Sequence, residues 1–420
     1  MKAILFLQFL LYFIFSTFSF GGMTDIDMSQ GGTAASGGAN IITKLKGVFY
    51  FIPIVLALLL VNKNYFSKIL LMLKKHKELF IYIIIVLVEL LWAANFNYSL
   101  TKLSIFLLSL FSLSSIIIQY EGIYKKTATY HIYNDLSIIG LFLSIILLVL
   151  FLIFGSFDLK MRNMFGPWCH ANSVAVLSGL FLFFLLHYKT HLIELNLFSP
   201  VKANKVHLSI FLMAFIFLVA FSRGAIVAFI FGYIGTRWLS YVWGQSSRAI
   251  VVYLVSMIIL AGAIVYSEKI LKTVSRSQKG EDIASMTGRD LIWAQIFFNL
   301  DNQALTYGHG YAALTKKVSV TLERKKIVGA HNTFLQVLAG AGIPGLFFFI
   351  LYIFSFYRRS KTRVFRSLEI NKIDYLAGMT IYLIIFSMGD MIFGLNLSPA
   401  FAIFIIVSHA THNKHILFES

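Results

Sequence analysis

Residues 136–154, LSIIGLFLSIILLVLFLIF, form a run of 19 residues without a charged side chain. A helix of about 20 apolar residues is long enough to cross the hydrocarbon core of a bilayer. Strands of a membrane barrel would instead alternate apolar and polar side chains over about ten positions, and this run does not alternate. The stretch therefore predicts a membrane-spanning helix.

The rest of the 420-residue chain has the same character. It is 58% hydrophobic and only 13% charged, with a mean hydropathy of +0.80, whereas soluble domains average about 25% charged residues. We expect an all-α polytopic membrane protein with about twelve spanning helices, built as one membrane domain over residues 1–420. The predicted spans are 3–20, 49–61, 79–93, 103–118, 136–154, 172–187, 207–222, 224–236, 249–266, 332–356, 375–392 and 397–411.

The first apolar segment, residues 3–20, has two interpretations. It is long for the apolar region of a signal peptide, and no small-residue cleavage site of the A-x-A kind follows it. We therefore interpret it as a first spanning helix, with a cleaved signal peptide as the alternative.

Charge sets the expected orientation in the membrane. The net charge is +18, and Lys and Arg are distributed unevenly between the segments that connect the spans. One alternating set holds 20 of them and the other holds 6, when the long segment 267–330 with its own 10 is set aside. Positive residues favour the cytoplasmic side, and long loops follow this rule poorly. We expect both termini in the cytoplasm and the 267–330 loop in the periplasm, provided that the chain turns at residues 222–224.

The 267–330 loop contains local structure. The segment TGRDLIWAQIFFNL, residues 287–300, repeats apolar side chains at helical spacing after a capping-box pattern. An amphipathic helix beside a membrane lies in the interface, a depth that suits Trp293. The sequence YGHGY, residues 307–311, predicts a turn.

Three cationic or titratable residues are expected on the external face: Arg223, Arg289 and His331. Arginine binds phosphate oxygens bidentately, so two arginines could hold a diphosphate. Histidine changes its protonation near neutral pH and can accept a hydroxyl proton. The alternatives are an Arg223 that reaches for lipid headgroups, an Arg289 on a solvated helix face, and a His331 that caps a helix together with Asn332.

Other classes of protein fit less well. The one cysteine, Cys169, excludes a Cys-based metal cage, and the chain has no G-x-x-x-x-G-K-[ST] phosphate loop. We therefore expect no metal and no other cofactor. Charged residues within the spans, which a transporter needs, are scarce, and Glu89 is the main exception. The simplest interpretation of Glu89 is that it forms a hydrogen bond between packed helices. A flippase for lipid-linked glycans is the alternative function of the whole chain.

One segment resembles the signature of the O-antigen ligase family. This signature is His-[Asn/Ser/Gln], nine residues, then Gly-x-x-Gly. Here HNTFLQVLAGAGIPG supplies His331 and Asn332, followed after nine residues by Gly342 and Gly345. Its glycines predict close helix contact or a helix break.

Four further segments are similar to family motifs, and the resemblance covers roughly residues 165–395. They are FSRGAIVAF (221–229) with Arg223, GRDLIWAQ (288–295) with Arg289, FGPWCHANSVAVLSG (165–179) with Asn172, and MGDMIFG (388–394) with Asp390.

The resemblance implies a metal-independent inverting glycosyltransferase at the periplasmic face of the bacterial inner membrane. Its donor is a glycan on undecaprenyl diphosphate. A ligase, the favoured reading, uses lipid A-core as the acceptor, whereas a polymerase uses a second lipid-linked glycan; no nucleic acid is expected. His331 is then the catalytic base, and the substrate-binding residues are Arg223, Arg289, Asn332, Asn172 and Asp390.

Overall fold

The structure is a computed structural model of the 420-residue chain. It describes residues 2–20, 55, 67–72, 76–155, 165, 169, 171–194, 199–220, 222–242, 293–294, 296–298, 300–311, 320–322, 325–327, 331–366, 375–389 and 398–413.

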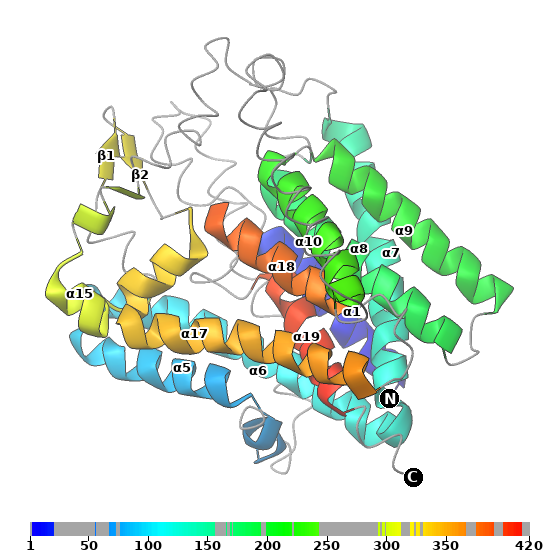
Figure 1. The fold of residues 1–420 in the computed structure, drawn as a ribbon, viewed down its shortest axis with the longest axis horizontal. Helices are drawn as coiled ribbons and strands as arrows, with labels where there is room; N and C mark the ends of the chain where they lie inside the picture. The colour runs from blue at the N-terminus through cyan, green and yellow to red at the C-terminus, as the bar shows by residue number, and fades with distance from the viewer. Residues whose placement is uncertain are drawn as a thin grey trace.

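The described residues form a bundle of helices, which confirms the all-α membrane class (Figure 1). Predicted spans 49–61 and 249–266 lie outside the described residues, apart from residue 55. Each of the other predicted spans overlaps a helix, with ends that differ by several residues. The α-helices are α1 Lys2–Phe20, α5 Lys77–Glu89, α6 Phe96–Tyr124, α7 Ala128–Phe154, α8 Ala171–Glu194, α9 Pro200–Val219, α10 Arg223–Val242, α15 Asn302–Tyr307, α17 Thr333–Arg366, α18 Tyr375–Gly389 and α19 Pro399–Asn413. Short 3-10 turns, η1 Leu90–Trp92 and η2 Lys125–Thr127, flank α6.

Local sequence explains where several helices begin. The Asn95 side chain caps α6 by accepting the N–H of Tyr98 at 3.1 Å. Ser199 caps α9, and Pro200 occupies the first helical position, where its missing N–H costs nothing. Helix α9 ends at Val219 and α10 begins at Arg223, so that a short connection separates the two helices.

Helix α8 lies inside the bundle and α9 lies at its edge (Figure 1). Every residue of α8 from Val174 to Leu185 is buried, and α8 packs against α9, α10, α18 and α19. By contrast, Phe211 and Leu218 on α9 are 67% and 63% exposed, as expected for side chains that face lipid. Helix α8 is therefore a central helix of the bundle, and α9 is an outer one.

Helix α17 is broken rather than continuous. Gly342 has φ 60° and ψ −172°, and Pro344 follows it within the same helix. The rings of Phe334 and Phe349 lie 6.2 Å apart, although 15 residues separate them, because the two parts of α17 meet at a bend (Figure 1). We call this bend the elbow. It confirms the predicted helix break, which falls within the span expected over 332–356.

A small antiparallel hairpin lies in the predicted periplasmic loop. Strand β1 Val320–Leu322 pairs with β2 Lys325–Ile327, and Thr321 lies opposite Lys326. The all-α expectation did not include this hairpin, because strands of three residues give no clear alternating pattern.

Candidate active site

Helices α10 and α18 run antiparallel. The ring of Phe229 contacts that of Tyr382, with centroids 6.3 Å apart. Further along α10, a Cβ added to Gly232 would lie 2.8 Å from the carbonyl oxygen of Gly378, so the backbones approach closely. From the first contact to the second, the residue number rises along α10 and falls along α18, so the two helices are antiparallel.

This pairing places Arg223 beside the last turn of α18. Arg223 lies six residues before Phe229, and Met388 lies six residues after Tyr382. A helix rises about 1.5 Å per residue, so both positions are about 9 Å beyond the ring contact, in the same direction. Arg223, which is partly buried, is therefore level with Met388.

The start of α8 lies at the same end of the bundle. The hydroxyl of Tyr382 donates a hydrogen bond to the carbonyl of Ala175 at 3.3 Å, and Phe183 contacts Gly378. Helix α8 is thus antiparallel to α18 as well. Asn172, three residues before Ala175, is partly buried near the end of α18 that Arg223 also approaches.

Asn332 fastens the start of α17 to this place. Its Oδ1 accepts the N–H of Leu335 at 3.1 Å, and its Nδ2 donates to the carbonyl of Met388 at 3.1 Å. The first bond is an N-cap, as the capping interpretation of this segment predicted. The second is a tether between the start of α17 and the last turn of α18.

His331 precedes this cap in a left-handed backbone conformation. Its φ is 46°, a region in which histidine and asparagine occur more often than most other residues with a side chain. The residue is partly buried. Because Asn332 is bonded to Met388, His331 lies at the same end of the bundle as Arg223.

The structure thus places four predicted site residues at the same end of the bundle: Asn172, Arg223, His331 and Asn332. Arg289 and Asp390 lie outside the described residues. Asp390 directly follows Gly389, the last residue of α18.

Three helices begin here, an arrangement that no single stretch of the sequence predicts. The N-termini of α8, α10 and α17 all lie at this end of the bundle. Each helix N-terminus carries unpaired N–H groups and a partial positive charge, and together with an arginine they attract anions. Their convergence depends on how the helices pack, which no local sequence pattern specifies.

The amphipathic segment of the loop packs on the first part of α17. Residues 293–294 and 296–298 are helical. Ile296 is fully buried against Leu335, Leu338 and Ala339, with Trp293 beside it, whereas Phe298 is 90% exposed. The described residues of the predicted helix are therefore helical, and Ile296 and Trp293 on its apolar side dock next to the candidate site, whereas Phe297 is 57% exposed.

Glu89 lies at the end of α5 and is 2% exposed. Its Oε2 makes no hydrogen bond within the part of the chain that the structure describes. The predicted helix-packing hydrogen bond is therefore not seen for this oxygen.

Comparison with known proteins matches part of the chain to one family. The sequence model of the family described as O-antigen ligase matches residues 208–350. The match includes Arg223, Asn332 and the whole segment from His331 to Gly345. A comparison with curated proteins found no match.

Proposed function

Because residues 208–350 carry the domain of the O-antigen ligase family, we propose that this bacterial membrane protein transfers a glycan from undecaprenyl diphosphate to a sugar hydroxyl. Members of the family are glycosyltransferase-like enzymes that process lipid-linked glycans. The observation that supports the proposal is that Arg223 and His331 lie at the same end of the bundle, where three helices begin. A ligase with lipid A-core as the acceptor is the favoured form.

Arg223 and Arg289 would hold the diphosphate of the donor. The guanidinium group presents a rigid fork of donors that fits phosphate oxygens, and the helix N-termini add N–H groups and positive charge. Trp293 follows Arg289 by four residues and packs beside the first part of α17, which supports a place for Arg289 near this site. These charges would do the work that a metal ion does in other diphosphate sites, so we propose transfer without a metal.

His331 would act as the general base. Its imidazole accepts the proton of the acceptor hydroxyl while that oxygen attacks the anomeric carbon from the face opposite the diphosphate. The bond between the anomeric carbon and the diphosphate oxygen breaks, and its electron pair leaves on the diphosphate. One displacement inverts the configuration of the anomeric carbon.

The remaining residues would shape the site. We assign Asn172 and Asp390 to substrate binding, because Asn172 lies at the start of α8 and Asp390 follows the last turn of α18. The amide oxygen and the amide nitrogen of Asn332 both form hydrogen bonds within the protein. We therefore propose that Asn332 serves substrate binding by holding His331 in place.

The site would face the periplasm of the inner membrane, with both termini in the cytoplasm. Cysteines introduced at Ser319 and Ser360 test this orientation: an impermeant thiol reagent added to intact spheroplasts should label S319C and leave S360C unlabelled. The native Cys169 is 2% exposed and serves as the background control. Labelling of S360C alone would invert the orientation and place the site in the cytoplasm.

A deletion strain tests the function and separates a ligase from a polymerase. For a ligase, we expect the loss of all O-antigen on lipid A-core and accumulation of polymer on undecaprenyl diphosphate. For a polymerase, lipid A-core would instead carry single repeat units. Unchanged lipopolysaccharide and unchanged lipid-linked glycans would contradict both forms of the proposal.

A further inference from the structure

The elbow of α17 leaves two carbonyl groups to be satisfied from outside the helix. In a continuous helix the carbonyl of Gly340 would bond to the N–H of residue 344, which is a proline and has none. The loop after α15 fills this place. His309 N–H donates to the carbonyl of Ala339 at 2.9 Å, and Gly310 N–H donates to that of Gly340 at 3.1 Å.

Glycines allow the loop and the elbow to come this close. Gly308, Gly310 and Gly342 all have positive φ values, of 77°, 96° and 60°. A Cβ on Gly342 would lie 2.8 Å from the carbonyl oxygen of Thr306, and one on Gly308 would collide with that of Gly340. Side chains on either surface would push the loop off the elbow.

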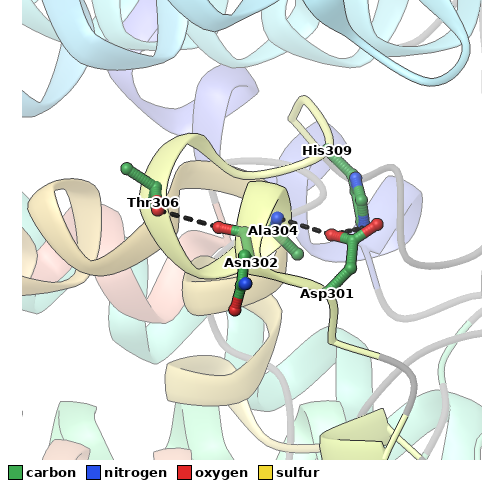
Figure 2. A network of polar contacts seen from close by, with 5 residues as sticks. All are labelled: Asp301, Asn302, Ala304, Thr306 and His309. Atoms are coloured by element: carbon green, nitrogen blue, oxygen red, sulfur yellow. Dashed lines mark hydrogen bonds and ion pairs between the residues drawn. The ribbon is translucent and has the colours of Figure 1, made fainter.

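His309 is held on its other sides as well, and it is only 2% exposed. Its carbonyl accepts the N–H of Ala94 at 2.8 Å, which joins the loop to the start of α6. Its Nε2 lies 3.4 Å from Oδ1 of Asp301, and the same oxygen caps α15 by accepting the N–H of Ala304 at 2.7 Å (Figure 2). We call residues 308–310, with Asp301, the elbow clamp.

The elbow clamp lies at one end of a short rigid segment and His331 lies at the other. The helix from Thr333 to Ala341 has nine residues, about 14 Å in length. Asn332 fixes the far end of this segment to Met388. Movement of the near end would therefore turn the segment about its tether, and His331 would move with it.

We propose that Asp301 and His309 are positioning residues that set the orientation of His331 through the elbow. This inference rests on the proposed function, because it assigns these two residues to a reaction in which His331 is the base. In this role, neither Asp301 nor His309 contacts the substrate. A shift of about 1 Å in a reacting group costs about 10²-fold in rate, so control of the elbow has a large effect on turnover.

Steady-state transfer by purified variants in detergent tests the inference. We expect His309→Ala to lower kcat about tenfold while the KM for the lipid-linked donor changes less than about twofold. His309→Gln should regain most of the rate, because its amide can donate to Asp301. Asp301→Asn should be close to wild type and Asp301→Ala should resemble His309→Ala. The matched control is Thr306→Ala, whose exposed hydroxyl donates to the carbonyl of Asn302 within α15 (Figure 2).

A double-mutant cycle with His331→Asn decides whether the elbow clamp acts through His331. If it does, His309→Ala causes no further loss once His331 is replaced. A further tenfold loss in the double variant would overturn the inference while leaving the proposed function intact. If His331→Asn alone were fully active, the proposed function would fail and the inference with it. Should His309→Ala fail to fold, Asp301→Ala takes its place in the cycle, since Asp301 is 53% exposed.

Discussion

Replacing His331 with asparagine should lower glycan transfer by about 10²- to 10⁴-fold, the usual cost of a missing general base. Asparagine is the suitable replacement because it tolerates the left-handed backbone at this position, where φ is 46°. Alanine would add backbone strain to the loss of the imidazole. The KM for the lipid-linked donor should change little, since the donor is bound by other groups.

The His331→Asn variant also decides between the two interpretations of this residue. Asparagine is a good helix cap, so a purely structural His331 would tolerate the change. The control is the purified yield and thermal stability of the variant, which should match the wild type because Asn332 already caps α17. Substantial transfer by His331→Asn would remove the base from the mechanism.

The second large effect is expected for Arg223→Ala. Removing a charged donor from a developing anion costs about 10²- to 10³-fold in rate, and Arg223→Lys should recover only part of it because lysine lacks the fork. Arg289→Ala should act in the same direction. Initial rates over a range of donor concentrations measure both effects.

A charge-matched control separates this role from a general loss of positive charge. Lys202 lies at the other end of the bundle, near the start of α9, where its ammonium group lies 5.2 Å from the ring of Tyr130. Lys202→Ala should therefore leave donor use unchanged. Near-normal transfer by both Arg223→Ala and Arg289→Ala, at normal protein level, would discard the diphosphate role.

Much of the fold could be predicted from the sequence, because long apolar runs and capping residues indicate spanning helices. Alternating Lys and Arg counts placed Arg223 and His331 on one side, and the structure brings them to one end of the bundle. The capping role of Asn332 was also readable from its place before an apolar helix.

What could not be predicted depends on contacts between distant parts of the chain. The glycines after His331 predicted a possible helix break. They did not indicate that the break would fall at Gly342, or that the YGHGY turn would donate hydrogen bonds to the carbonyls of Ala339 and Gly340. The bonds of His309 reach Ala94 on one side and Ala339 on the other, and no local pattern encodes such partners. The hairpin of β1 and β2 was missed because its strands are too short to show a period.

The most direct measurement is glycan transfer by the purified chain in detergent, with undecaprenyl-diphosphate-linked glycan as the donor, lipid A-core or a second lipid-linked glycan as the acceptor, and a chelator present. We expect the glycan to appear on the acceptor with the wild type and to be missing with His331→Asn. Detergent removes the two compartments that a flippase needs, so transfer under these conditions identifies an enzyme. If the folded wild type transfers nothing in detergent but moves lipid-linked glycan across vesicle membranes, the chain is a flippase and not a transferase.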